Sequence, residues 1–336
     1  MDLITHAFTG ALVAATLAPK ITRRPTAIVG GISACLPDVD VLIRSSTDPL
    51  LVLEYHRHFT HSLFFSPFGA AVAALILSPL LRRHLSASAL YKAAIAGYIS
   101  ACLLDVCTSY GTRLFWPLAP QSIALNWIAV VDPVFTLLIA IGLVFTLRGR
   151  NLLPWFGLAA GALYLGVGAL QLQRAESAAR QWADVQSLPI EKILAKPTLG
   201  NLVLWRVLLV NQNNVQVIAV RAGVSSPQIY VGDHAELLDL ATLSLPESSR
   251  AYQDVQRFYQ VSEGYLVTMD GAEDHIGDLR YAMLPTSVVP LWGIIVDKQN
   301  PAGETRAFTR RDSSPQVRDA FMRMLTGEPL HGDPPL

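Results

Sequence analysis

Six apolar runs within the first 172 residues constrain the fold more than any other feature of this sequence. They cover Leu3–Pro19, Thr26–Ile43, Thr60–Leu81, Ala89–Cys107, Asn126–Leu147 and Leu152–Leu172. Most of them approach the roughly 20 residues that a helix needs to cross the hydrocarbon core of a membrane. The first run has no basic residue ahead of it, so we expect a retained helix and not a cleaved signal peptide. We therefore predict an α-helical multi-pass membrane domain with six transmembrane helices.

The distribution of charge divides the chain into an apolar half and an ordinary half. Charged residues make up only 15% of the 336 residues. Residues 1–172 contain 18 of the 52 charged residues, and residues 173–336 contain the other 34. We predict a transmembrane domain over 1–172, a helical linker punctuated by prolines over 173–197 and an α+β soluble domain over 198–336. The formal net charge of +0 gives no reason to expect nucleic acid as a partner.

The second half has the patterns of a small α+β domain outside the membrane. Two β-branched, apolar stretches flank residues 211–214 and predict a hairpin. A helix is expected over Ser248–Gln260. Further strands are expected at Tyr265–Met269, Leu279–Leu284 and Val288–Val296.

The charged residues between the apolar runs are sorted by sign. Alternate connections carry eight basic residues and no acid, namely Lys20, Arg23, Arg24, Arg82, Arg83, Lys92, Arg148 and Arg150. The other connections carry all seven acids of this half, namely Asp2, Asp38, Asp40, Asp48, Glu54, Asp105 and Asp132. An excess of Lys and Arg marks the cytoplasmic side of a membrane. Six crossings would then place both termini and the C-terminal domain on the extracytoplasmic side.

The acidic side also carries four histidines, which makes it the place to look for chemistry. The imidazoles and carboxylates that come from five helix ends on this side are His6, His56, His58, His61, Asp38, Asp40, Asp105 and Asp132. Imidazole and carboxylate are the ligands of zinc and other divalent transition metals. Carboxylates close to hydrocarbon need a partner, and a shared cation supplies one. The sequence therefore predicts a metal centre at this membrane face.

Spacing leaves some of the ligands open. Asp38 and Asp40 point the same way if the chain is extended there. His58 and His61 share a helical face, whereas His56 converges on the site only from an incoming loop. Spacing alone does not decide which two of the three histidines bind.

Two further residues have alternative interpretations. Asp132 precedes Pro133, so its carboxylate either serves the site or caps the N-terminus of a helix. Arg57 either binds a phosphate or is an interfacial arginine.

Taken together, these residues resemble the membrane-bound metal-dependent hydrolase family of the YdjM type, which has LexA-linked members. The resemblance covers about the first 150 residues and rests on His6, Pro37-Asp38-x-Asp40, His56-Arg57-x-x-Thr60-His61-Ser62, Asp105 with Tyr110-Gly111-Thr112, and Asp132-Pro133. It implies a multi-pass protein of the bacterial inner membrane with a hydrolase site. On this pattern His56 and His61 match the family histidines, and His58 occupies a variable position.

We therefore expect a membrane-bound metal-dependent hydrolase with its site at the extracytoplasmic face. One or two divalent cations, for which the donors favour zinc, would be held by His6, Asp38, Asp40, His56, His61 and Asp105. Asp40 or Asp132 would accept a proton, and Arg57 would bind a phosphoester of a lipid-like substrate drawn from the bilayer.

Other classes of protein are disfavoured or remain as alternatives. The chain has no Gly-x-Ser-x-Gly elbow, no His-Glu-x-x-His motif and no Gly-rich nucleotide loop, which disfavours serine hydrolases and zincins. The main alternative is a non-enzymatic metal-binding protein with a structural or transport role. A third interpretation gives the main activity to the C-terminal domain, with the membrane half as its anchor.

Overall fold

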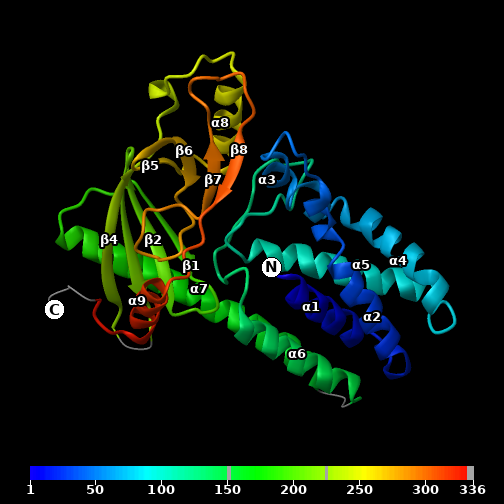
Figure 1. Ribbon diagram of the computed structural model, residues 1–336. Helices are drawn as coiled ribbons and strands as arrows, with labels where there is room; N and C mark the ends of the chain where they lie inside the picture. The colour runs from blue at the N-terminus through cyan, green and yellow to red at the C-terminus, as the bar shows by residue number, and fades with distance from the viewer. Residues whose placement is uncertain (150–152, 224–225, 331–336) are drawn as a thin grey trace. The chain divides into compact units, whose positions relative to one another are not determined.

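The computed structural model describes residues 1–149, 153–223 and 226–330, which form two compact units (Figure 1). The first, which we call the helical unit, consists of Met1–Ile43, Tyr55–Leu170 and Leu199–Leu202. The second, which we call the sheet unit, consists of Arg44–Glu54, Gln171–Thr198 and the chain from Val203 onward. Arg150, one of the eight basic residues in the charge argument, lies outside the described residues.

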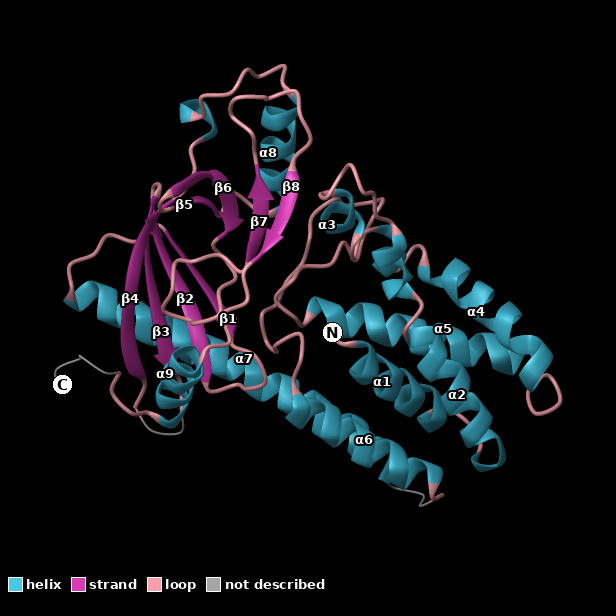
Figure 2. Ribbon diagram, in the orientation of Figure 1, coloured by secondary structure: helices cyan, strands magenta, loops and turns pink. Residues whose placement is uncertain are grey.

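The helical unit is built from helices that follow the apolar runs (Figure 2). They are α1 (Leu3–Thr16), α2 (Arg23–Ala34), α4 (Ser66–Leu81), α5 (Ala87–Val106), α6 (Pro133–Leu147) and the first part of α7 (Leu153–Val185). Short 3-10 helices lie at the ends of some of them, namely η1 (Lys20–Thr22), η2 (Pro37–Leu42) and η3 (Phe59–His61). The residues predicted as ligands lie at or near these ends.

Glycines bring α1, α2 and α5 into close contact. A Cβ on Gly10 of α1 would lie 2.5 Å from the Gly30 carbonyl oxygen of α2, and one on Gly97 of α5 would lie 2.1 Å from the same atom. Small residues at helix interfaces allow this kind of backbone approach in membrane proteins. The contact positions three of the helices whose ends carry the candidate ligands.

Helix length limits how many crossings the structure supports. Among the described residues, Lys20–Leu42, Ala87–Val106 and Trp155–Val185 are long and apolar enough to span, and a pair bent by 86°, Leu51–His61 with Ser66–Leu81, would make a fourth. Helices α1 and α6 have 14 and 15 residues. At about 1.5 Å per residue they are shorter than the roughly 30 Å hydrocarbon core. The structure thus shows a helical region with three to four candidate spans, and the expectation of six is not confirmed.

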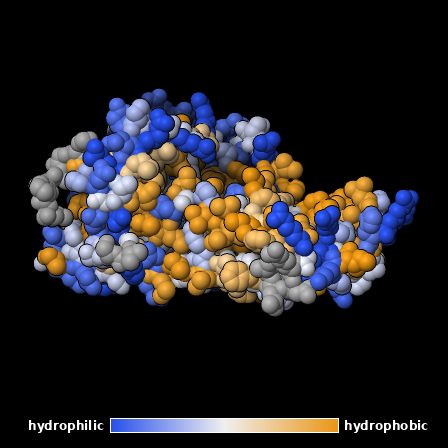
Figure 3. All heavy atoms as spheres, turned by 90° about the horizontal axis from the view of Figure 1, so that it is seen from below, coloured by the Kyte–Doolittle hydropathy of each residue, from blue (hydrophilic) through white to orange (hydrophobic). Residues whose placement is uncertain are grey.

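Large apolar side chains point outward from the helical unit. Leu75 on α4, Leu137 on α6 and Leu163 on α7 are all more than half exposed. Figure 3 shows apolar side chains gathered over much of the face that it draws. Exposed apolar patches of this kind mark an interaction surface, which for long apolar helices is the lipid bilayer.

The sheet unit contains two antiparallel sheets of four strands each. The first has the order β1 (Lys192–Pro197), β2 (Leu204–Asn211), β3 (Asn214–Arg221) and β4 (Gln228–Glu236). The second has the order β5 (Leu266–Met269), β6 (Ala272–Asp278), β7 (Trp292–Ile295) and β8 (Arg306–Thr309). Helices α3 (Leu51–Tyr55), α8 (Arg250–Val261) and α9 (Pro315–Thr326) and the 3-10 helix η4 (Leu240–Thr242) complete the described elements. A mixed helix-and-sheet domain follows the apolar half, as predicted.

The second part of α7 packs on the first sheet. Alanines 175, 179 and 183 are fully buried in one core with Trp205 and Ile218 of strands β2 and β3. The stretch 173–197, expected to be a linker, consists of the end of α7, a short connection and strand β1, all of which belong to the sheet unit within Gln171–Thr198. Its prolines do not separate it from the domain, because Pro197 is the last residue of an edge strand, where a missing N–H is tolerated.

Local patterns predicted some of these elements and missed others. The hairpin at 211–214 is confirmed, because Asn211 pairs with Asn214 across a two-residue turn. The helix over Ser248–Gln260 is confirmed as α8, which Ser249 caps. The strand at Leu279–Leu284 is wrong. The carboxylate of Asp278 accepts the Arg280 backbone N–H at 3.0 Å and turns the chain there.

Strand β6 was missed because it is polar. It forms a hairpin with β5 in which Met269 pairs with Ala272. The turn residues are Asp270 and Gly271, and Gly271 has φ +72°. Asp-Gly is a hairpin signal in itself, so the turn was detectable even though the strand lacked an apolar pattern.

Candidate metal centre

Buried imidazoles and carboxylates meet at the ends of helices in the helical unit. His6 comes from the first turns of α1, Asp38 and Asp40 from η2, His61 from η3 and Asp105 from the last turn of α5. The side chains of His6, Asp40, His61 and Asp105 are fully buried, and that of Asp38 is 11% exposed. The structure therefore brings together residues that are up to 99 positions apart in the chain, from Asp105 to His6.

Asp105 lies at the centre of this group. Its Oδ1 lies 3.2 Å from His6 Nε2 and 3.0 Å from Arg57 Nη2, and its Oδ2 lies 3.1 Å from His61 Nε2. The Met1 ammonium group also contacts Oδ1. A carboxylate without solvent exposure needs such partners, because burial penalises the charged form.

His61 connects the three carboxylates. Its Nε2 lies 3.4 Å from Asp38 Oδ1 and 3.1 Å from Asp105, and its Nδ1 lies 3.2 Å from Asp40 Oδ2. One ring nitrogen thus faces Asp38 and Asp105, and the other is oriented by Asp40. Metal-binding histidines in proteins are held in this way by a carboxylate on the nitrogen that does not bind the metal.

Asp40 has a different environment from Asp38. Its Oδ2 accepts hydrogen bonds from the Arg57 backbone N–H at 2.8 Å and the Thr60 hydroxyl at 2.8 Å. Its Oδ1 lies 2.8 Å from His56 Nδ1. Residues 37–42 form a 3-10 helix and are not extended, yet both aspartates contact His61, Asp38 through its Oδ1 and Asp40 through its Oδ2. Asp38 faces His6 and Asp105, whereas Asp40 faces His56 and the loop at Arg57.

Two groups in this cluster have the geometry of a cation site. The potential ligand atoms of His6, Asp38 and Asp105 lie within 4.8 Å of one another, and so do those of Asp38, Asp40 and His56. Among the described residues, the buried atoms His6 Nε2, His61 Nε2 and Asp105 Oδ2 make ion-pair contacts at 3.1–3.2 Å but no contact with hydrogen-bond geometry. Unsatisfied buried polar atoms of this kind call for an ion or a water.

The charges of the cluster fit a cation as well. The three carboxylates of Asp38, Asp40 and Asp105 face two fixed positive groups, the Arg57 guanidinium and the Met1 ammonium. With neutral imidazoles this leaves an excess of negative charge in a buried site, which a divalent cation would compensate. The donor atoms are nitrogen and oxygen, as zinc and related metals require.

Arg57 is buried within the cluster. Its guanidinium donates to the Thr108 hydroxyl at 2.6 Å and lies over the Tyr110 ring, 5.3 Å from the ring centre. Its backbone has φ +58°, a conformation that non-glycine residues seldom adopt. The hydrogen bond from its N–H to Asp40 helps to hold it there. Since the guanidinium already binds Asp105 and Thr108, the structure places Arg57 as a partner of the ligands.

Asp132 and His58 have other surroundings. Asp132 caps α6 by accepting the Phe135 N–H at 3.0 Å, and its carboxylate also accepts the Tyr164 hydroxyl at 3.0 Å. The structure therefore shows the capping role that its position before a proline predicted. The His58 ring lies beside Trp116, with 5.5 Å between ring centres. His56, in contrast, lies beside His61, with 6.1 Å between ring centres.

Several contributors to the site were not predicted. The Thr60 hydroxyl donates to Asp40. The Thr108 hydroxyl accepts from the Arg57 guanidinium. Tyr98, in the middle of α5, donates to the Thr60 carbonyl oxygen at 2.8 Å. Of these residues, only Thr60 had a signal in the sequence, because it stands directly before His61 in the family motif.

Comparison with known proteins gives one match, to a family of membrane proteins, and it covers the first half of the chain. The sequence profile of the YdjM inner membrane protein family matches residues 1–175, more than half of the chain. The chain belongs to this family. No curated protein and no solved structure matches. Membership and the apolar helices together support a protein of the inner membrane, as the motif resemblance implied.

Proposed function

We propose that this member of the YdjM family is a membrane-bound metal-dependent hydrolase. His6, Asp38, His61 and Asp105 would hold a divalent cation, for which the nitrogen and oxygen donors favour zinc. The observation that carries the proposal is the convergence of buried donors: ligand atoms of His6, Asp38 and Asp105 lie within 4.8 Å of one another, and His61 Nε2 lies 3.1 Å from Asp105 and 3.4 Å from Asp38.

Each residue around the cation would have a distinct task. A bound divalent cation lowers the pKa of a coordinated water and polarises the bond to be cleaved. Asp40 orients His61 through Nδ1 and also holds His56 Nδ1. The His56 side chain is 21% exposed, so its free Nε2 would accept the proton that the attacking water releases. If Asp38, Asp40 and His56 instead bind a second ion, the metal content would be two per chain.

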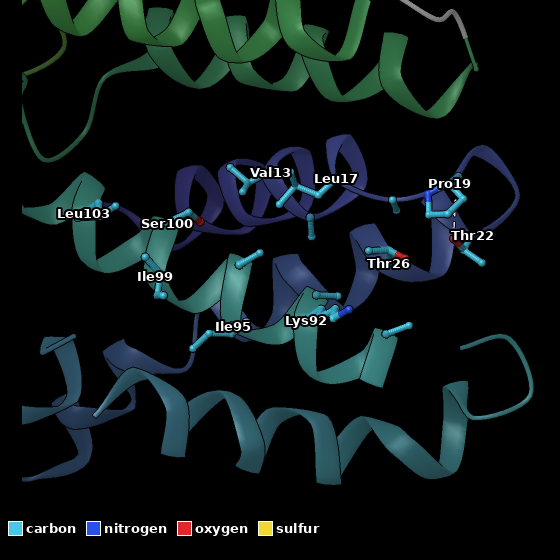
Figure 4. Close-up of a pocket in the computed structure, with 15 residues that line it drawn as sticks. Val13, Leu17, Pro19, Thr22, Thr26, Lys92, Ile95, Ile99, Ser100 and Leu103 are labelled. Carbon is cyan, nitrogen blue, oxygen red and sulfur yellow. Dashed lines mark hydrogen bonds between the residues drawn. The ribbon is translucent and has the colours of Figure 1, made fainter. Parts of the chain in front are cut away.

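An apolar groove in the helical unit supports a lipid-like substrate. It has a volume of about 630 Å³ and lies between α1, α2 and α5 (Figure 4). Leu103 and Ser100 line one end, within about two turns of Asp105 along α5. Thr26 and Lys92 line the region towards the basic loops. None of the candidate ligands lines the groove, so the proposal is that an acyl chain occupies it while the phosphoester passes beyond its Leu103 end to the cation.

Metal content tests the proposal first. The full chain, purified in detergent and reloaded with zinc after mild chelation, should hold stoichiometric metal. His61→Ala and Asp38→Ala should lose it, and His84→Ala, which changes an exposed histidine, should retain it. A parent protein without metal, or ligand variants that keep it, would contradict the assigned site.

Substrate class is tested with paired phosphoesters. Ala96→Phe would fill the groove that Ala96 lines. It should slow hydrolysis of a long-chain phospholipid and leave a short, water-soluble phosphoester unaffected. Leu75→Phe changes an exposed position on α4 and is the control. Equal losses on both substrates would exclude the groove as an acyl-chain site.

The orientation in the membrane is part of the proposal. With an even number of crossings, the charge asymmetry supports a metal site and a sheet unit at the extracytoplasmic face. An alkaline phosphatase reporter fused to the C-terminus should then be active, since that enzyme folds only outside the cytoplasm. An inactive, stably expressed fusion would place the sheet unit in the cytoplasm.

One observation favours a second candidate function. Asp105 already contacts the Arg57 guanidinium and the Met1 ammonium, so much of its charge is compensated. The alternative is therefore a structural or transport protein whose cation fixes the helix ends without catalysis. Stoichiometric metal, loss of stability on chelation and no turnover of any phosphoester would favour it.

A further inference from the structure

The chain between the two ligand-bearing stretches belongs to the sheet unit. Asp38 and Asp40 precede this segment and His56 and His61 follow it, and all four lie in the helical unit. The segment itself, Arg44–Glu54, clusters with the C-terminal half of the chain. We call these eleven residues the strap.

An apolar anchor fixes the strap within the sheet unit. Leu50 is 0% exposed and belongs to a core with Val255 and Phe258 of α8 and Leu266 of β5. Leu53, one turn later, packs against the same core. Burial of these two leucines removes apolar surface from water and so favours the ordered strap.

A single arginine of α8 adds a polar anchor. Arg257 Nη2 lies 2.9 Å from Asp48 Oδ2, and Nε lies 2.7 Å from Glu54 Oε1. Further bonds from Nη1 to Asp48 and from Nη2 to Glu54 make both contacts two-pronged. Asp254, one turn before Arg257, accepts from Nη1 at 3.0 Å and keeps the guanidinium in position. Forked arginine–carboxylate pairs of this kind are strong and geometrically specific.

Two acids of the strap thus flank its buried leucine, and one guanidinium holds both. Glu54 is only two residues before His56, and Asp48 is ten residues after Asp38. Without an anchor, a connection of this length would have many conformations. Binding a cation between its two ends would then have to order it, which lowers the affinity for the cation.

We propose that the sheet unit preorganises the metal centre through the strap, with Arg257 as a positioning residue. This inference rests on the proposed metal site. Arg257 acts by limiting the positions available to the two ligand-bearing stretches, and the chain connection alone transmits the effect. It gives the C-terminal half a role that the family match, which ends at residue 175, does not cover.

The test compares two arginines of the sheet unit in the full-length protein. Arg257→Gln removes the fork to the strap. Arg323→Gln removes an arginine that pairs with Asp319 at 2.8 Å on α9, and is the matched control. Each protein is titrated with Co²⁺, whose visible absorption reports on ligand geometry, and hydrogen exchange is followed in peptides that cover residues 36–61.

Arg257→Gln should weaken Co²⁺ binding about tenfold, alter the absorption band and speed exchange in the strap. Arg257→Lys, which keeps the charge but not the fork, should recover part of the affinity. The control should match the parent. A merely structural loss would lower the melting temperature without changing the absorption band of the bound metal.

The outcomes separate this inference from the proposed function. If the parent itself binds no Co²⁺, the metal site fails and the inference fails with it. If the parent binds and Arg257→Gln binds equally well, the metal site stands and the strap has no positioning role. Should Arg257→Gln fail to fold, the double variant Asp48→Asn, Glu54→Gln removes the same contacts from the strap side and decides the question.

Discussion

The two units of this protein both bury charged side chains, but they satisfy them differently. In the helical unit, ligand atoms of His6, His61 and Asp105 lack hydrogen-bond partners among the described residues. In the sheet unit, Arg280 binds Asp278 at 2.8 Å and the Val261 carbonyl oxygen at 2.9 Å. The buried ligand atoms of the helical unit still lack hydrogen bonds, which a bound ion or water would supply. In the sheet unit, the protein itself satisfies most of the buried charged groups.

The basic cluster of the sheet unit is a buried group of charged side chains that requires no metal ion. Its members are Lys196, Arg206, Asp278 and Arg280, all less than a tenth exposed. Arg206 donates to the carbonyl oxygens of Leu279 at 2.7 Å and Ser287 at 2.7 Å. Cations dominate there, and carbonyl and carboxylate oxygens accept most of their hydrogens, although Arg206 Nε forms no hydrogen bond among the described residues. The metal centre instead has an excess of acceptors, which is why we assign a cation to one cluster and not to the other.

Loss of Asp105 should produce the largest effect of all. Asp105→Asn keeps the shape of the side chain but removes the charge that faces His6, His61 and Arg57. We expect bound metal to disappear and hydrolysis to fall by more than the roughly 10–100-fold that a supporting residue of a metal site costs. Metal analysis and a phosphoester assay on the same preparation measure this. Retained metal would remove the contrast between the two clusters.

Arg280→Met should have the opposite profile. Removing one partner of a buried ion pair costs about 3–5 kcal/mol of stability, because Asp278 would stay buried without its cation. We expect a lower melting temperature for the sheet unit, followed by the fluorescence of its tryptophans, and an unchanged metal content. Arg323→Gln, which removes a partly exposed ion pair with Asp319, should cost less than about 1 kcal/mol. Metal loss in Arg280→Met would show that the clusters are not independent.

Chelation should destabilise the helical unit alone. With free metal at about 100 times the dissociation constant, binding stabilises the folded state by about 2.7 kcal/mol, which chelation removes. We expect the parent to melt at a lower temperature after chelation and to recover on adding zinc. His61→Ala should show no such response. A parent insensitive to chelation would speak against a bound cation.

The smallest effect concerns pH and Lys196. Burial and the nearby Arg280 lower the pKa of Lys196 to about 7. In the unfolded chain the amine keeps its proton up to about pH 10, so the unfolded state binds more protons between pH 7 and 10, and this group makes folding more favourable as pH rises. Lys196→Met should remove that contribution. From pH 7 to pH 9, the melting temperature of the parent should rise by a few degrees relative to that of the variant. A difference between the two proteins that stays constant with pH would contradict the lowered pKa.

Much of the metal centre was predictable because its residues lie at helix ends. His6, Asp38, His61 and Asp105 each stand beside an apolar run, and membrane-spanning geometry brings alternate ends to one level. Asp132 shows the limit of that argument. It lies at a helix end like the others, yet it caps α6 and binds Tyr164. Position along the chain does not say which way a carboxylate points.

The second half was less predictable for a related reason. Continuous apolar, β-branched stretches identified β2 and β3, which are buried on both faces. It missed β6, which pairs through its backbone and has mostly polar side chains. It also gave no sign that Leu50 belongs to the core of a domain that begins more than 100 residues later. Contacts of that range leave no periodic pattern.

By itself, the sequence determined that the first half is apolar and helical, that its acids and histidines gather at one end of the helices, and which family it belongs to. The first two features follow from the apolar runs and the charges between them, which are local, and the family follows from the resemblance of its motif residues. Only the tertiary structure decided that Asp40 supports histidines while Asp38 faces His6 and Asp105, and that Arg257 holds the strap. Those roles depend on the direction of side chains and on pairs such as Arg257 and Asp48, 209 residues apart, which only the folded chain brings together.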